Sequence, residues 1–153
     1  MSKLSVSTDV PTEIHLTRLF DAPRHLVHRA MSEPALIRQW LGGVRARVAS
    51  AEVDLRVGGS YRYVFALPDG SSFFFTGIFR EVGDERIVHS ELFNGEPPGS
   101  VVTTTFVEQS GKTTVKWVIA FESQEIRDRV LSTGMADGAG ESYDELEQLL
   151  VGL

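Results

Sequence analysis

The chain has 153 residues, of which 42% are hydrophobic and 24% charged; its formal net charge is −6 and it has no cysteine. This length favours a single domain over residues 1–153, large enough for a real hydrophobic core. The lack of cysteine excludes disulfides, thiolate metal sites and a cysteine nucleophile. The apolar runs are only a few residues long, so we expect no membrane span. No basic start followed by an apolar block is present, so we expect no signal peptide and a cytoplasmic location.

The negative charge is concentrated near the C-terminus. Residues 122–147 carry eight acidic side chains and two arginines, a balance of −6, so the rest of the chain is neutral overall. Nucleic-acid binding needs a basic patch or stripe; Arg45, Arg47 and Arg56 form a local basic group, but no aromatic residue is interleaved with them. We therefore expect no nucleic-acid partner, and a solvated acidic face on a C-terminal helix.

The N-terminal third predicts one strand and two short helices. Residues 1–11 are rich in Ser, Thr and Asp, and we expect them to be a flexible lead-in. Residues 13–20 alternate as a strand does. Residues 21–32 and 32–43 each begin with a side chain that can cap a helix and a proline in the first turn, and the second segment ends in two glycines.

The middle of the chain predicts six further strands, most of them joined by tight turns and therefore antiparallel. Residues 94–100 contain two prolines, which cannot donate to a ladder, and are predicted as a loop. The six strands are expected at residues 47–55, 60–67, 72–82, 86–93, 101–109 and 113–121.

The C-terminal part predicts a short helix at residues 123–133 and a long one at 134–150. The long helix has one apolar stripe at spacings of three or four residues, formed by Met135, Ala139, Tyr143, Leu146 and Leu150. One strand, two short helices, six strands and a long helix indicate an α+β fold, in which the helices are segregated from an antiparallel sheet. We expect the sheet to curl over the apolar stripe.

Alternation along the strands sorts the aromatic side chains by face. Phe74 is predicted on the outer face, whereas seven other aromatic residues point toward the helix side: Tyr61, Tyr63, Phe65, Phe73, Phe75, Phe79 and Trp117. Three interpretations stay open for this surface, namely ordinary core, a pocket for a small molecule, and a dimer interface. Alternation puts Glu81 on the inner face, where burial would favour the protonated form of its carboxyl group; the alternative is that it emerges into water at the strand end.

Several stretches in combination resemble a known family. Ala22-Pro23, Trp40, Gly58-Gly59 and the glycine-rich start of the last helix are similar to the domain homologous to the activator of the 90-kDa heat-shock chaperone's ATPase. The resemblance covers residues 13–151. That family belongs to the helix-grip superfamily (SRPBCC) of START domains, polyketide cyclases and birch-pollen-type allergens. The resemblance implies a seven-stranded antiparallel sheet gripping a long C-terminal helix, with two short helices after the first strand.

The chain departs from the family pattern at two places. Leu41 and Gly43 stand where the family usually has Trp and Pro, and Ala139-Gly140 stand where the last helix usually has a bulky Trp. Smaller side chains leave more room between helix and sheet, unless the aromatic residues fill it. A dry pocket of about 300 Å³ would cost about 7 kcal/mol, so a large pocket has to hold water or a ligand.

The leading hypothesis is a noncatalytic domain that binds a small apolar or aromatic ligand between the sheet and the C-terminal helix, without a cofactor. The hydroxyls of Tyr61 and Tyr63 can orient a polar group of the ligand. The candidate lining residues are Trp40, Tyr61, Tyr63, Phe65, Phe73, Phe75, Phe79, Trp117 and Met135.

Two alternatives come from other functional classes. An enzyme of cyclase or dehydratase type would use Glu81 or His89 as its general base. A chaperone-associated cofactor role is implied by the family resemblance, but its eukaryotic members carry this domain behind another chaperone-binding domain, for which this chain has no room.

The last expectations concern metal binding and self-association. His25 and His28 are spaced as two ligands on one helix face, but no third ligand is placed, so we expect a solvated face and no metal. His15 lies in a strand and is expected to be structural. Exposure of Phe74 and Ile78 is compatible with a monomer or a weak homodimer.

Overall fold

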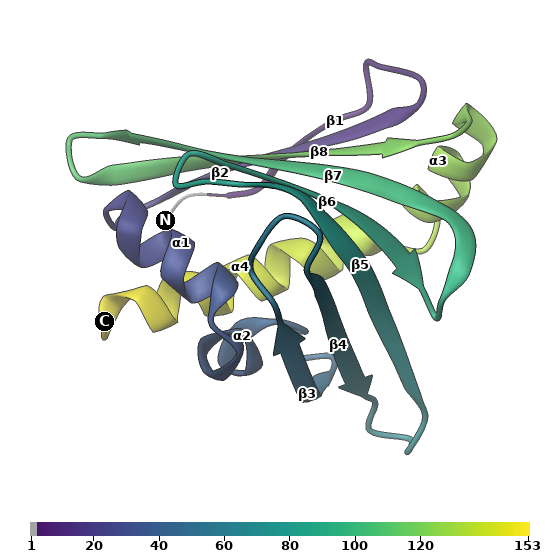
Figure 1. Cartoon of the computed structure of the whole chain (residues 1–153), viewed down its shortest axis with the longest axis horizontal. Coiled ribbons are helices and arrows are strands. Elements are labelled where there is room, and N and C mark those ends of the chain that lie inside the picture. The colour runs from purple at the N-terminus through teal and green to yellow at the C-terminus, as the bar shows by residue number, and fades with distance from the viewer. Residues whose placement is uncertain (1–2) are drawn as a thin grey trace.

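A curved antiparallel sheet holds a long C-terminal helix against its concave face in the computed structural model, which describes residues 3–153 (Figure 1). Within these residues the sheet has eight strands in the order β1-β2-β8-β7-β6-β5-β4-β3. The strands are β1 (Ser5–Ser7), β2 (Glu13–Phe20), β3 (Arg47–Val53), β4 (Ser60–Ala66), β5 (Ser72–Val82), β6 (Arg86–Phe93), β7 (Glu96–Gln109) and β8 (Lys112–Phe121). The helices are α1 (Arg24–Ser32), α2 (Pro34–Trp40), α3 (Gln124–Leu131) and α4 (Met135–Val151).

The predicted α+β architecture is confirmed, but the count of seven strands is wrong by one. The additional strand is β1, which lies within residues 1–11 and pairs with β2, with Ser5 opposite Thr17. Three residues are too few to show an alternating pattern, so periodicity could not reveal this strand.

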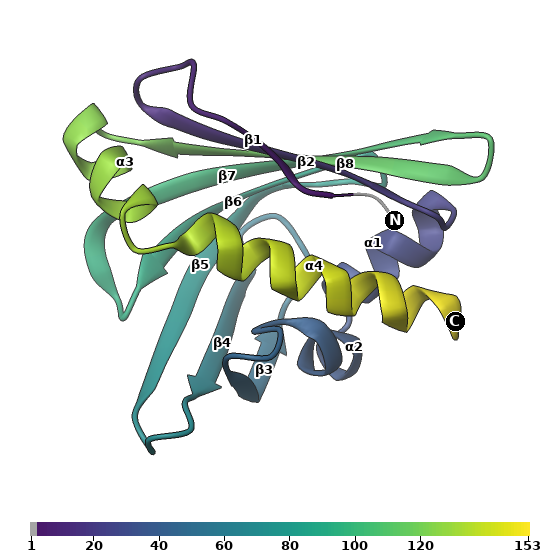
Figure 2. The same ribbon diagram turned by 180° about the vertical axis from the view of Figure 1, so that it is seen from behind.

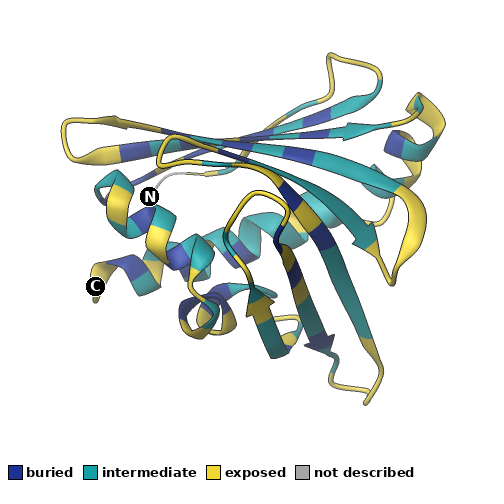
Figure 3. Ribbon diagram, viewed as in Figure 1, coloured by how far each residue is buried: buried dark blue, intermediate teal, exposed yellow. Residues whose placement is uncertain are grey.

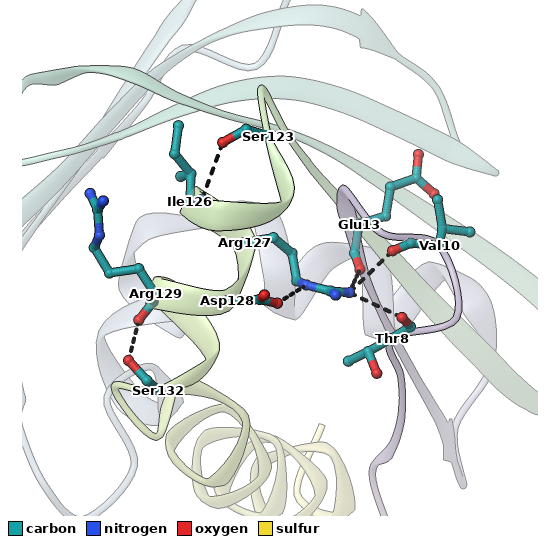
Figure 4. Close-up of polar contacts among 9 residues, drawn as sticks. All are labelled: Thr8, Val10, Glu13, Ser123, Ile126, Arg127, Asp128, Arg129 and Ser132. Carbon is teal, nitrogen blue, oxygen red and sulfur yellow. Dashed lines mark hydrogen bonds and ion pairs between the residues drawn. The ribbon is translucent and has the colours of Figure 1, made fainter.

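A buried arginine of α3 holds the turn between β1 and β2 (Figure 4). Arg127 is 5% exposed, and its Nε donates to the Asp128 carboxylate at 2.8 Å. Its Nη1 donates at 3.0–3.1 Å to the carbonyl oxygens of Thr8, Val10 and Glu13. One buried guanidinium thus pairs several carbonyls of the N-terminal segment, which ties this segment to a helix 114 or more residues away in sequence.

The segment predicted as a loop over residues 94–100 is mostly strand. Asn94 and Gly95 form a two-residue turn with positive φ at both positions, the turn that closes a tight hairpin. The following prolines, Pro97 and Pro98, lie where β7 has left its other neighbour, because pairing with β8 begins only at Ser100. Their missing N–H groups therefore remove no bond on the β8 side, which is why β7 tolerates them.

Helix α4 crosses the concave face of the sheet (Figure 2). Its predicted apolar stripe faces the sheet, and Leu146 and Leu150 are buried on it. Buried residues lie mostly within the strands and helices, and exposed residues gather at the turns between strands (Figure 3). Helices α1 and α2 both contact α4. Among the described residues, no helix is both long and apolar enough to cross a membrane.

Candidate functional site

A cavity of about 220 Å³ lies between the inner face of the sheet and the N-terminal half of α4. A smaller lobe of about 60 Å³ adjoins it, and Met31, Tyr63, His89 and Thr104 line both. The wall of the larger lobe is mostly apolar, formed by Leu16, Met31, Ile37, Trp40, Leu41, Val102, Trp117, Ile119, Met135 and Ala139. Its polar lining consists of Tyr63, His89, Glu91, Thr104 and Tyr143.

Side-chain spacing on α4 explains why the cavity lies at this end of the helix. Met135, Ala139 and Tyr143 follow each other at four-residue intervals, so they lie on the same face of the helix. All three line the cavity. The small Ala139 leaves space where a larger side chain would fill the gap between helix and sheet.

Glu91 is the single acidic residue of the cavity lining. Alternation along β6 puts it on the inner face with Ile87 and His89. Its carboxyl group makes no hydrogen bond or ion pair with residues 3–153, and burial alone raises its pKa to about 7. A carboxyl group whose pKa lies near neutrality can be either proton donor or acceptor, and such shifts are frequent at functional sites.

His89 lies next to Glu91 on the inner face and is neutral at pH 7, because burial lowers its pKa. Its Nδ1 donates to the Ser90 carbonyl oxygen at 3.0 Å. Since a carbonyl can only accept, the proton of the neutral ring sits on Nδ1, and Nε2 is left as an acceptor.

The same carbonyl also holds Tyr61, whose hydroxyl donates to the Ser90 oxygen at 2.9 Å. The β5–β6 ladder is irregular here, because Ile78 N donates to Ser90 Oγ at 2.9 Å. Gly77 makes the arrangement possible: a Cβ there would lie 1.9 Å from the Ser90 oxygen and 2.5 Å from the Tyr61 ring. Tyr61 therefore packs against His89, and the two rings meet edge to face with their centroids 4.9 Å apart.

Aromatic rings form the wall near Glu91. The rings of Trp117 and Tyr143 stack with their centroids 4.1 Å apart, and the Trp40 ring lies 6.0 Å from Tyr143. Burial raises the pKa of Tyr63 and of Tyr143, and the negative charge of Glu91 adds to both shifts. The carboxylate is thus close enough to both phenol groups to affect them.

Five of the nine predicted lining residues lie on the cavity. Trp40, Tyr63, Trp117 and Met135 line the larger lobe, and Phe79 lines the smaller one. Tyr61 does not line either lobe, although it holds the backbone and ring next to His89.

The remaining three predicted residues belong to a separate aromatic cluster with Phe93. The rings of Phe65 and Phe73 stack at 4.8 Å, and Phe75 meets Phe93 edge to face at 5.4 Å. These rings pack against each other on the part of β4 and β5 that leads to their shared turn, and none lines the two lobes. Phe93 is 48% exposed, so the cluster reaches the surface.

The expectation that Glu81 shares the inner face is wrong. The register of β5 against β6 shifts between Phe79 and Glu81, and such a bulge interrupts strict alternation. Glu81 is consequently exposed, and its Oε2 pairs with Arg86 Nε at 3.0 Å. The outer-face position of Phe74 agrees with alternation, since the Arg62 guanidinium lies 4.8 Å from its ring centroid.

Sequence reasoning missed Glu91, the carboxyl group that does line the cavity. The signal was present, because Glu91 follows His89 by two residues in the same strand, and alternation therefore predicts the same face for both. Tyr143 was assigned to the helix stripe but not to the lining, since helical spacing alone does not distinguish a packed position from a cavity wall.

The other histidines lie away from the cavity. His28 Nε2 bonds to the Gly83 carbonyl oxygen at 3.0 Å, and His15 Nε2 meets the Glu13 carboxylate at 2.7 Å. His25 is in a surface depression with Arg24 and His28. Residues 3–153 contain no group of three or more His, Cys, Asp or Glu side chains placed to hold a metal ion.

A curved, open antiparallel sheet with a C-terminal helix on its concave face and two short helices between β2 and β3 is the helix-grip arrangement that the resemblance implied. The chain belongs to the family described as activator of Hsp90 ATPase homolog 1-like protein, whose model matches residues 21–151. The predicted family is thereby confirmed.

Solved structures of similar proteins support the fold. A crystal structure from Rhodobacter sphaeroides has a TM-score of 0.93 at 25% identity, covering 99% of each chain. One from Nitrosomonas europaea has a TM-score of 0.86 at 26% identity, covering 94% of this chain and 97% of the other. The AHSA1-like protein from Aeromonas hydrophila, at 21% identity and a TM-score of 0.70, covers 88% of this chain and 93% of its own. No curated protein sequence matches the chain.

Proposed function

We propose that the chain binds a small, largely apolar molecule that carries one polar group, in the cavity between the sheet and α4. The observation that carries the proposal is the cavity itself: about 220 Å³, walled by apolar and aromatic side chains, with an unpaired Glu91 in its lining. Ligand sites typically combine such a wall with a few convergent polar groups.

The two departures from the family pattern support this proposal. Leu41 and Ala139 occupy positions where the family usually has Trp, and both line the cavity. The chain thus has smaller side chains at two points of one wall. An engineered apolar cavity of about 150 Å³ is known to admit benzene, so the present volume suits a ring with a short substituent.

The test is native mass spectrometry of the protein purified from its own host, combined with titration of an apolar fluorescent probe. We expect a bound species or saturable probe binding. Ala139→Trp should abolish it by filling the cavity, whereas Gln148→Trp, which adds the same side chain to the exposed face of α4, should retain it. An unbound mass together with no probe binding, or equal binding by the two variants, would contradict the proposal.

A second candidate is an enzyme that transfers protons, of the cyclase or dehydratase type. The observation that favours it is the pair of Glu91 and His89, two neighbouring acid–base groups on the cavity. Their environments move the two pKa values in opposite directions, which is useful in acid–base catalysis. The base would then be Glu91 or His89, in place of Glu81.

This candidate is tested by following the dehydration of β-hydroxy ketones that carry a phenyl ring. If the chain is such an enzyme, Glu91→Gln loses turnover by at least about a hundredfold while it still binds the unreacted ketone. Glu81→Gln serves as the control and should keep full activity. Absence of turnover above the buffer rate in the unmodified protein would leave binding as the function.

A further inference from the structure

We propose that the cavity selects a small organic cation, such as a protonated arylalkylamine, over anions of the same size. This inference rests on the proposed binding function and names the chemical class of its ligand. It follows from the charge of the lining, from the aromatic surface beside the carboxyl group, and from the hydrogen-bonding groups left without partners.

The cavity lining offers no lysine or arginine that could pair with the negative charge of an acidic ligand. Neither lobe is lined by lysine or arginine, and Glu91 is the acidic residue of the larger lobe. Arg45, which lies toward the same helix, forms an ion pair with Glu141. A carboxylate or phosphate ligand would therefore enter an apolar cavity without an opposite charge and beside a like one, which is strongly unfavourable.

The aromatic rings beside Glu91 suit a cation. Trp117, Tyr143 and Tyr63 line the same lobe as the carboxyl group, and the first two form a continuous stacked surface. The face of an aromatic ring attracts an ammonium group, and the attraction grows when the cation is desolvated. A carboxylate with three surrounding rings offers an ammonium ion both charge neutralisation and π contacts.

The unpartnered polar groups add acceptors. The carboxylate of Glu91 and Nε2 of His89 can accept hydrogen bonds from a ligand. An ammonium group has donors only, so it matches these acceptors better than a carboxylate would.

The volume limits the size of the cation. The larger lobe, about 220 Å³, exceeds the 150 Å³ or so that holds benzene, but it does not accommodate a long acyl chain. A single aromatic ring with a short aminoalkyl substituent fits these limits, with the ring among the apolar side chains and the amine at Glu91.

Binding of a cation is expected to depend on pH through Glu91. The ionisable groups facing it are Tyr61 and Tyr63 on β4, His89 on β6 and Tyr143 on α4, whereas the cavity side chains of α1, α2, β2, β7 and β8 carry none. Burial raises the pKa of Glu91 to about 7, so below that pH a proton competes with the amine. The tyrosines stay neutral because burial raises their pKa values further, and a protonated His89 would repel the amine in the same pH direction.

The experiment compares three probes of matched shape: 2-phenylethylamine, 2-phenylethanol and phenylacetate. Each is titrated into the full chain at pH 8 by isothermal calorimetry and by NMR. We expect the amine to bind at least about tenfold more tightly than the alcohol, and phenylacetate to bind more weakly than both. From pH 5.5 to pH 8 the affinity for the amine should rise about 30-fold, and that for the alcohol should change little.

Variants assign the selectivity to the carboxyl group. Glu91→Gln should remove the preference for the amine and its pH dependence while binding of the alcohol persists, and Glu52→Gln, an exposed position on β3, should change neither. If Glu91→Gln fails to fold, the pH dependence of the unmodified protein still decides the question.

The outcomes separate this inference from the proposed function. Equal or tighter binding of phenylacetate, or an amine preference that survives Glu91→Gln, overturns the inference and leaves the binding function standing. Failure of all three probes in a protein that still binds the fluorescent probe overturns the inference alone, whereas failure of the fluorescent probe as well, together with an unbound mass, overturns both.

Discussion

The two halves of helix α4 share one apolar stripe but end in different environments. In the C-terminal half, Leu146 and Leu150 are 0% and 4% exposed and belong to the main core. In the N-terminal half, Met135 and Ala139 follow the same spacing, yet they line a cavity. Periodicity determines which side of a helix faces the sheet, and side-chain volume then determines whether the space between them is filled.

The two halves also differ in the treatment of polar groups. The cavity half faces Glu91, which has no partner among residues 3–153 and whose pKa is raised to about 7. A buried carboxyl group in this state lowers stability at neutral pH, and proteins commonly accept such a cost where a function needs it. The C-terminal half of α4 thus packs closely against the core, whereas the N-terminal half faces a carboxyl group that lowers stability at neutral pH.

The largest effect is expected in the packed half. Leu146→Ala should lower the free energy of unfolding by about 3 kcal/mol, because a fully buried leucine leaves a cavity in a rigid surrounding. Val151→Ala, at an exposed position of the same helix, should cost less than about 0.5 kcal/mol. Urea denaturation measures both. A loss below about 1 kcal/mol for Leu146→Ala would show that this half is not tightly packed.

The next effect concerns the cavity half and depends on pH. The pKa of Glu91 is higher in the folded protein than in an unfolded chain, so its protonated form stabilises the fold below about pH 4.5, and this contribution is lost as the pH rises through 7. Glu91→Gln should therefore come close to the unmodified protein at pH 4.5 and exceed its stability by about 3 kcal/mol at pH 8. Denaturation curves at the two pH values provide the measurement. A constant difference between them would show that Glu91 is not desolvated.

An intermediate effect is expected at Asp144, which lies in the packed C-terminal half of α4 and pairs with a buried arginine. The Arg18 side chain is 1% exposed, and its Nη1 donates to the Asp144 carboxylate at 2.6 Å. Asp144→Asn should cost about 2 kcal/mol, because it leaves the buried guanidinium without its countercharge, although the exposure of Asp144 reduces the loss.

Two variants control this prediction. Asp137→Asn removes an exposed carboxylate from the first turn of α4 and should cost less than about 1 kcal/mol, the usual contribution of such a charge at a helix N-terminus. Adding Arg18→Met to Asp144→Asn should recover most of the stability, since the buried charge is then absent. If the double variant is as unstable as Asp144→Asn, the loss comes from packing rather than from charge.

The smallest effect tests the cavity directly. Ala139→Trp adds apolar volume where space exists, so the free energy of unfolding should change by less than about 1.5 kcal/mol while ligand binding is lost. A comparable loss of stability to that of Leu146→Ala would mean that the N-terminal half is as closely packed as the C-terminal half. Thermal and urea unfolding distinguish these outcomes.

Much of the fold was predictable because it depends on local patterns. The strands that carry alternating residues, the hairpin turns and the stripe of α4 all follow from spacing within short segments. The errors arose where pairing with a distant segment mattered. Strand β1 depends on β2 and on Arg127, and β7 starts early because its prolines lie beyond the end of β8.

The face of the sheet that carries the candidate site could be predicted from the sequence, but the full set of residues that line the site could not. Alternation correctly put Trp117 and Tyr63 on the inner face, and the same rule places Glu91 there. It misplaced Glu81, because a single bulge between neighbouring strands reverses the face of the residues beyond it. The aromatic residues Phe65 and Phe73 are on the expected face, yet they pack against each other rather than around the cavity.

Residue spacing in the chain determines the order of its elements, its antiparallel sheet and the apolar stripe of α4, and its motifs carry the resemblance to the family. The tertiary structure decides which inner-face residues touch empty space, that Glu91 rather than Glu81 is desolvated, and that Ser90 holds both Tyr61 and His89. The physical reason is range: alternation and helical spacing act over a few residues, whereas a cavity and a shifted pKa depend on the volumes and charges of segments that meet only after folding.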